Sequence, residues 1–240
     1  MKPSLAWVVI ALGLMISHAG ADTRTVRVFV ALADNASQGI AKVPAKIGNG
    51  DDAELNLYWG NSEGFKSVFG RSKSWKLEKA EANPVPEILD RRTYKHACQD
   101  CRIIAEAWRG KNIRECLEAF LAALHSPENT VSSPSSGTMA SWMGPFPFRG
   151  SEQRHSRRMP SSSAVFSGRY FQSHLDAAKS RPVLSTAQLM YPGSFLLRDA
   201  LEVWLRQGSR SDIRMAAARA YASNQKISVK AASGVFTKLE

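Results

Sequence analysis

The middle of this chain is the feature that most limits what it can fold into, because it lacks a secondary-structure pattern. From Ser126 to Ser163 the sequence holds 11 Ser and 5 Pro in 38 residues, with neither the alternation of a strand nor the apolar stripe of a helix. Such a composition is typical of a disordered linker. Well-patterned segments lie on both sides, so a single domain built from them has to bridge this stretch.

The first 21 residues have the features of a secretory signal peptide. Lys2 precedes an uncharged apolar run from Leu5 to Ile16, and the small residues Ala19, Gly20 and Ala21 follow. The run is too short to span a membrane as a helix, and no later stretch is long enough either. We therefore expect cleavage near Ala21 and export of residues 22–240 to the periplasm or the cell exterior.

Length and charge exclude few classes of function. The chain has 240 residues, of which 44% are hydrophobic, enough for the core of one domain. Its formal net charge is +11. The basic residues are scattered over 71–76, 91–95, 156–158 and 206–210, which favours a solvated surface over a nucleic-acid interface. We expect no nucleic-acid partner, and the sequence indicates no other.

The three cysteines allow two interpretations. In an oxidising compartment Cys98 and Cys101 are candidates for a small disulfide, or all three, with Cys116, remain thiols. A zinc site would need four ligands, drawn from these cysteines with His96 or His125. No second ligand pair at zinc spacing supports it, and the strand–CxxC–helix context of a redox motif is missing. We expect no metal and no cofactor.

The segments around the middle alternate strands with helices. The predicted strands are Thr25–Asp34, Trp75–Lys79, Leu89–His96 as an edge strand, Arg102–Trp108 and Pro182–Leu189, with a turn at Asn83–Pro86. The predicted helices are Ser62–Gly70, Ile113–Leu124, Tyr170–Ala178, Phe195–Gln207 and Ser211–Asn224, the last capped by Ser211.

This alternation predicts an α/β domain with a mostly parallel sheet flanked by helices. Residues 22–125 and 166–240 form its two parts, separated by an irregular segment at 126–165. A parallel sheet of this kind needs one or two more central strands, and the written sequence offers none there. The strands at 25–34 and 102–108 would then have unpaired edges, so we expect poor solubility or loose packing.

One long loop brings carboxylates and aromatic residues to the carboxyl end of the first strand. It contains GNGDD at 48–52 and NLYWG at 56–60. Sites in α/β sheets form at this edge. Asp51 and Asp52 are candidates for binding a cation or basic ligand, and Tyr58 and Trp59 for stacking. Ordinary turn chemistry explains the same residues, so both interpretations stay open.

The flanks also resemble a known family. The segments VFVALADN, VPAKIGNGDDAELNLYWG, RYFQSHL and PVLSTAQLM are similar to a family of uncharacterised exported bacterial proteins with a caspase-like pattern, most clearly over 26–60 and 168–205. In that family a central strand ends in Gly-His-Asn/Asp-Gly-Leu-Met-Asp, and a later strand ends in Cys before Tyr-Phe. The resemblance implies a caspase-like fold and a thiol hydrolase with a His base and a Cys nucleophile. Neither motif is present as written, because no Cys follows Cys116 and no Gly follows His155.

Back-translation of the middle segment shows that a displaced reading frame could encode both motifs. Read from the third base of each codon, Gly137 to Met143 gives two positions that admit His or Asn. A forced Gly, two apolar positions and a forced Asp follow. That pattern includes His-Asn-Gly-Leu-Met-Asp. In the same frame, Val131 to Ser136 becomes an apolar run broken by one small residue and ending in Arg, Trp or Gly, if its serines use TCN codons. The counterparts of the missing His-Gly therefore lie near Gly137 and Thr138.

The same displaced frame also supplies the second motif. Met159 to Val165 becomes Ala, three apolar residues and two positions, at Ala164 and Val165, that each admit Cys. We therefore interpret residues at about 126–165 as a frameshifted segment bounded by two compensating shifts. As written, the chain has no catalytic residue of this type. The alternatives are a non-catalytic periplasmic binding protein, or a structural or envelope-associated protein.

Overall fold

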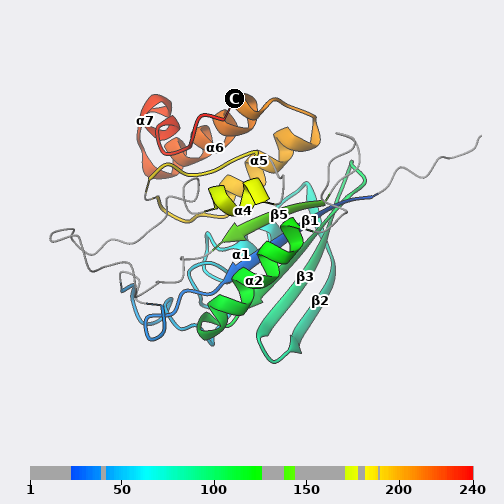
Figure 1. Ribbon diagram of the computed structural model, residues 1–240, viewed down its shortest axis with the longest axis vertical. Coiled ribbons are helices and arrows are strands. Elements are labelled where there is room, and N and C mark those ends of the chain that lie inside the picture. Colours follow the sequence, from blue (N-terminus) through cyan, green and yellow to red (C-terminus); the bar gives the residue numbers. More distant parts are fainter. Residues whose placement is uncertain are drawn as a thin grey trace, which may run out of the picture.

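A computed structural model describes residues 23–38, 42–125, 138–143, 171–177, 182–188 and 190–239. Five strands form one mixed sheet in the order β2-β3-β4-β1-β5 (Figure 1). Their bounds are β1 Arg24–Ala31, β2 Trp75–Val85, β3 Ile88–His96, β4 Cys101–Trp108 and β5 Thr138–Met143.

Six α-helices and one short 3₁₀ turn complete the described elements. They are α1 Phe65–Gly70, the 3₁₀ turn Gly110–Asn112, α2 Ile113–Leu124, α4 Gln172–Ala177, α5 Phe195–Leu205, α6 Arg210–Gln225 and α7 Val229–Ser233. Helices α5, α6 and α7 gather in the upper part of Figure 1, and the β2–β3 hairpin reaches away from them. No helix in the described part of the chain is long and apolar enough to cross a membrane.

Strand β1 divides the core between the two faces of the sheet, because successive side chains of a strand point to opposite faces. Val26, Val28 and Val30 pack with α1 and α5 on one face. Phe29 and Ala31 pack with α2 on the other face. Both sets are almost fully buried, so β1 is the centre of the domain.

A third group of buried residues belongs to the C-terminal helices alone. Leu196 of α5 packs with Tyr221 of α6 and with Phe236 after α7. Helix α6 begins with a capping box, in which the Ser209 side chain accepts a hydrogen bond from the Asp212 backbone and Asp212 accepts one from the Ser209 backbone. The predicted cap at Ser211 is therefore wrong by two residues.

The prediction of a mostly parallel sheet is wrong. Strand β1 pairs in parallel with β4 and β5, whereas β2–β3 and β3–β4 are antiparallel. Short connections join β2, β3 and β4, and such connections allow only antiparallel neighbours. The mixed α/β architecture with helices on the sheet is confirmed.

Two local predictions in this antiparallel part are also wrong. The predicted edge strand Leu89–His96 is the internal strand β3, with neighbours on both sides. The predicted turn at Asn83–Pro86 falls partly inside β2, which continues to Val85. Asn83 adopts a positive φ of 47°, and the sheet register shifts between Ala82 and Val85. The Asn and Pro residues that predicted a turn therefore mark an irregularity near the end of strand β2.

The middle segment contains a strand, contrary to the prediction that it offers none. Strand β5 pairs with β1 from Thr25↔Thr138 to Val30↔Met143. The predicted unpaired edges at 25–34 and 102–108 are therefore wrong, because β1 and β4 each have two neighbours. The predicted strand Pro182–Leu189 is also wrong where it is described, since only an isolated bridge joins Thr186 to Phe236. A strand needs a continuous partner, and residues 182–188, as far as the structure describes this segment, show a single bridge.

Candidate functional site

The parallel strands β1 and β4 end side by side, with Ala31 opposite Trp108. The chain leaves β1 toward α1 on one face, and leaves β4 toward α2 on the opposite face. Diverging connections of this kind create a switch point, where α/β sheets commonly bind ligands.

Here the switch point is filled by the protein itself. Gln38 is only 5% exposed, and its Nε2 donates to the carbonyls of Leu32 at 2.7 Å and Gly110 at 3.0 Å. A Cβ at Gly110 would lie 2.3 Å from the Cβ of Asp34, so only glycine allows this approach. Because the switch point is closed, a ligand could reach only the surface of the neighbouring loop at 48–60.

The loop at 48–60 is fixed to β1 by one buried amide. Asn56 donates through Nδ2 to the carbonyls of Ala33 at 2.8 Å and Asn49 at 2.9 Å. Its Oδ1 accepts from the backbone N–H of Ala33 at 3.0 Å and of Tyr58 at 3.1 Å. Both donors and the acceptor oxygen are used, and the side chain has no exposed surface. Turn chemistry is therefore part of what these polar residues do.

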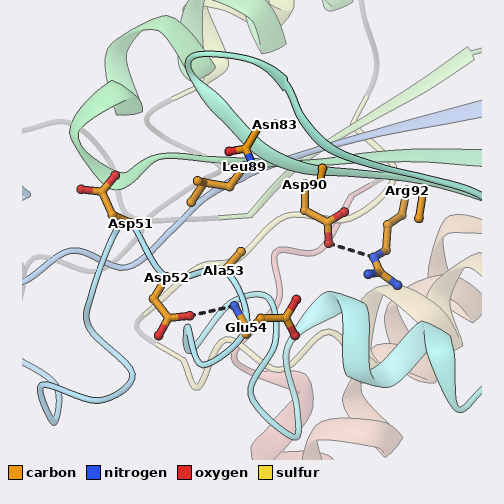
Figure 2. A pocket seen from close by; sticks show the side chains of 10 residues that line it. Asp51, Asp52, Ala53, Glu54, Asn83, Leu89, Asp90 and Arg92 are labelled. Carbon is orange, nitrogen blue, oxygen red and sulfur yellow. Dashed lines mark hydrogen bonds and ion pairs between the residues drawn. The ribbon is translucent and has the colours of Figure 1, made fainter.

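A groove of about 460 Å³ lies between this loop and the β2–β3 hairpin (Figure 2). One wall is the segment 51–54, and the other comes from both strands of the hairpin. The lining residues are Asp51, Asp52, Ala53, Glu54, Ala80, Ala82, Asn83, Leu89, Asp90 and Arg92. Four carboxylates and one guanidinium therefore face a partly apolar floor.

The two predicted carboxylates both line the groove. Asp51 is exposed and accepts a hydrogen bond at 2.6 Å from Nη1 of Arg109, the residue after β4. Asp52 uses Oδ1 to accept from the backbone N–H groups of Glu54 at 3.0 Å and Leu55 at 3.2 Å. That leaves Oδ2 of Asp52 without a hydrogen-bond partner in the described part of the protein.

The two predicted aromatic residues are core residues, so the prediction of surface stacking is wrong. Trp59 has no exposed surface and stacks on Phe65 of α1 at 5.3 Å between ring centroids. Burial raises the pKa of Tyr58 to about 12. Their place in a polar loop indicated a surface position, but both residues belong to the buried cluster that includes Phe65 of α1 and Tyr94 of β3.

The sequence did not single out the inner end of the groove. Asp90 is 8% exposed, and its Oδ2 accepts from Trp59 Nε1 at 2.9 Å and from Arg92 Nε at 2.8 Å. Asp90 and Arg92 are two residues apart on β3, and alternate strand residues share a face. The spacing of Asp90 and Arg92 could have indicated that they share a face. The other basic residues of the segment made this pair hard to recognise in the sequence.

A Cys98–Cys101 disulfide and unpaired thiols were both open, and in the structure Cys98, Cys101 and Cys116 are all free thiols. Burial raises the pKa of Cys101 to about 11, and raises that of Cys116 well above its ordinary value. The two buried thiols lie on opposite faces of the sheet. They therefore cannot share a zinc ion, and no group of three or more His, Cys, Asp or Glu among the described residues is placed to hold a metal.

The two histidines near these thiols have other partners. His96 Nδ1 accepts from the backbone N–H groups of Cys98 at 3.2 Å and Gln99 at 3.0 Å. His125 ends α2, with Nδ1 2.8 Å from the carbonyl oxygen of Leu121. Because its Nδ1 lone pair is used by the turn, His96 cannot accept a proton from Cys98 through that nitrogen.

The displaced-frame positions are only partly within the described chain. Thr138 is the first residue of β5, whereas Gly137, Ala164 and Val165 lie outside the described residues, as does the predicted signal peptide. Comparisons of the chain with models of protein families, with curated proteins and with solved structures gave no match.

Proposed function

We propose that this chain is a relative of exported caspase-like cysteine hydrolases whose central segment is written in a displaced reading frame. The written residues at about 126–165 contain neither the His-Gly nor the Cys motif. The polypeptide as given should therefore have no thiol-hydrolase activity, although its fold would be that of an active relative.

The resemblance of the flanks, together with the two motifs that the displaced frame admits, carries this proposal. Strand β5 lies inside the proposed frameshifted segment and pairs in parallel with β1, on the side away from β4. In the family that the flanks resemble, a central parallel strand leads into the His-Gly motif. Strand β5 covers Thr138–Met143, the residues that the displaced frame would turn into the His motif, so it supports a strand beside β1 in this part of the chain but does not bear on the reading frame.

The chemistry of the restored chain would follow from a His and a Cys at the carboxyl ends of neighbouring strands. The imidazole would act as general base and the thiol as nucleophile, with backbone N–H groups holding the oxyanion. Cys101 and Cys116 are poor substitutes, since burial and a raised pKa keep both as thiols.

The nucleotide sequence across codons 120–170 tests the proposal directly. We expect third bases that encode His in the displaced frame at Gly137 or Thr138, and Cys at Ala164 or Val165. Third bases that forbid either residue would overturn the frameshift.

Activity of a repaired gene is the second test. We expect the frame-restored protein to hydrolyse members of a peptide substrate panel, and alanine at the restored cysteine to abolish turnover. Turnover that survives this replacement would refute the nucleophile, whereas an inactive but folded repaired protein would refute the hydrolase.

A further inference from the structure

We propose that His96 is an acid-sensitive latch. The neutral ring holds the turn at residues 97–100 closed, and the protonated ring releases this turn and binds Glu202 of α5 instead. The inference does not depend on the hydrolase proposal, since every residue that it uses belongs to the described part of the chain as written. It rests on the different partners that the two ring nitrogens face.

The neutral ring is fixed by the turn. His96 is more than nine-tenths buried, and its Nδ1 accepts hydrogen bonds from the backbone N–H groups of Cys98 and Gln99. A ring nitrogen that accepts hydrogen bonds carries no proton, so these two donors assign the hydrogen of the neutral ring to Nε2. A second proton therefore has to go to Nδ1. There it removes the acceptor and places a third N–H group against the other two, so the turn has to open.

The other ring nitrogen faces a carboxylate to which it makes no hydrogen bond. Nε2 of His96 lies 3.5 Å from Oε2 of Glu202. Nε2 of His96 and Oε1 of Glu202 are both buried, and neither has a hydrogen-bond partner in the described part of the protein. A buried polar atom without a partner is costly, and a bond between imidazolium and carboxylate is stronger than one to the neutral ring. Glu202 is therefore placed to hold the ring once it leaves the turn.

The neighbouring side chains leave this exchange of partners possible. Arg206 of α5 lies 3.7 Å from the same oxygen of Glu202, but its side chain is mostly exposed, so it competes only weakly. Strand β2 contributes the uncharged ring of Trp75, at 4.8 Å between ring centroids. Lys95, the preceding residue of β3, is exposed and points to the opposite face of the sheet. Glu202 is therefore the group that can receive the imidazolium.

Opening of the turn reaches the start of β1. The backbone N–H of Arg24 donates to the carbonyl of Asp100 at 3.2 Å, and Nη2 of Arg24 donates to Oε1 of Gln99 at 3.1 Å. The carboxylate of Asp100 accepts from the hydroxyl of Thr23 at 3.0 Å, and the thiol of Cys98 in the turn is exposed. Imidazole is the side chain that ordinarily titrates between about pH 5 and 8. A response of the turn and of Arg24 in that range is therefore expected from the histidine.

Hydrogen exchange measured by NMR on the purified chain, from about pH 8 down to about pH 5, tests the latch. The open turn binds one proton more than the closed turn, so acid favours it. We expect the protection factors of the Cys98 and Gln99 amides to fall about tenfold for each pH unit below the midpoint, and the Arg24 amide to follow. The Ala97 amide is the internal control, because it donates to the carbonyl of Ser74 at 2.7 Å and should stay protected.

The ring nitrogens of His96 can be followed in the same titration. We expect Nε2 to carry the proton at high pH, and Nδ1 to gain one at the pH at which the two amides lose protection. A proton gained at Nδ1 while Cys98 and Gln99 stay protected would contradict the latch. So would unchanged protection of both amides down to the lowest pH.

Three variants test the role of each group. His96→Asn keeps an acceptor oxygen near the position of Nδ1 but does not titrate, so the protection of Cys98 and Gln99 should no longer depend on pH. Glu202→Gln removes the charge that receives the imidazolium, and opening should move to lower pH by about half a unit. His125→Asn, at the exposed end of α2, is the matched control and should respond as the parent chain does.

The same pH response in His96→Asn as in the parent chain would overturn the proposal. If His96→Asn does not fold, the ring nitrogens and the Cys98 and Gln99 amides of the parent chain still decide, because the latch requires them to change at one pH.

Discussion

Two buried amides, Asn56 and Gln38, hold the backbone beyond β1 in place of a regular ladder. Each uses its side-chain oxygen and nitrogen on main-chain groups of Leu32, Ala33 and Asp34. Because amides satisfy donors and acceptors without charge, the loop can pack against the core with little desolvation cost. The loop residues 51–54, which form one wall of the groove, are therefore held in a fixed position.

Replacement of Asn56 should show how much of the stability depends on this wall. Asn56→Ala leaves two backbone N–H groups and the carbonyl of Ala33 without partners, whereas the carbonyl of Asn49 keeps the N–H of Asp52 at 3.3 Å. We expect a loss of about 3 kcal/mol in the free energy of unfolding. Urea denaturation measures the change. Asn112→Ala is the control, since that side chain makes no capping hydrogen bond, and should change stability by less than about 0.5 kcal/mol. Equal effects of the two variants would contradict the role of Asn56.

The buried thiol of Cys101 predicts a loss of stability at alkaline pH. Its pKa is raised from 9.0 to about 11 by burial, so the unfolded chain releases the proton at lower pH than the folded protein does. The stabilisation is complete below about pH 9 and declines as pH rises toward 11. Tyr58, raised from 10.0 to about 12, acts in the same direction at higher pH.

Free energies of unfolding measured between pH 8 and 11 check this expectation. Cys101→Ala should reduce the slope of stability against pH, whatever its cost at neutral pH. Cys98→Ala, at an exposed thiol, should leave the slope as it is. A slope in Cys101→Ala as steep as in the parent chain would show that another group is responsible.

At the candidate site, the sequence identified carboxylates but not the chemistry around them. Asp51 and Asp52 follow from their place in a Gly-rich loop after a strand. The burial of Trp59 and its bond to Asp90 depend on how α1 and β3 pack, and local sequence contains no information on that packing. The groove could not be predicted from the sequence, because its two walls, residues 51–54 and the β2–β3 hairpin, lie in separate parts of the chain.

Among the elements, helix α6 offers the sharpest test of a local signal. Its capping box uses Ser209, whereas Ser211, one residue inside the helix start, makes none of these bonds. Ser209→Ala should cost about 1 kcal/mol of stability. Ser211→Ala should cost clearly less, since a serine inside the first turn gains little. Thermal or urea unfolding of both variants compares them, and a larger loss in Ser211→Ala would contradict the cap.

The elements that the sequence predicted well have strong patterns of their own. Helix α2 occupies Ile113–Leu124 as predicted, because its apolar stripe is continuous. Strand β3 was misplaced at an edge because of its basic residues. In the sheet Arg91 pairs with Glu106 of the neighbouring strand β4 at 2.8 Å, whereas Arg92 pairs with Asp90 of its own strand. Pairing across strands is a tertiary property, so the strand itself was predictable and its position was not.

For the whole molecule, we still expect the chain as written to be poorly soluble or loosely packed, for a reason that differs from unpaired inner strands. Strand β5 is the last strand of the parallel half of the sheet and has a single neighbour among the described strands. Parallel strands are stable when covered and continued on both sides. The frame-restored chain should be more soluble and should melt at a higher temperature.

Calorimetry and light scattering of the 22–240 chain, written and restored, make that comparison. A cooperative melt of the written chain at the same high temperature as the restored one would contradict the expectation. It would also mean that the written segment completes the sheet as well as the displaced frame does.

The pairing of β1 also sets the order in which this fold can be made. Arg24 pairs with Cys101 and Thr25 with Thr138, so the first strand leaves the ribosome long before either neighbour exists. The β2–β3–β4 meander has only local connections and can form early, whereas closing β1 between β4 and β5 carries the entropy cost of two long loops. Until then its run of Val and Phe residues is an aggregation hazard. Strand β1 therefore stays without its second neighbour until the residues of β5 have been made.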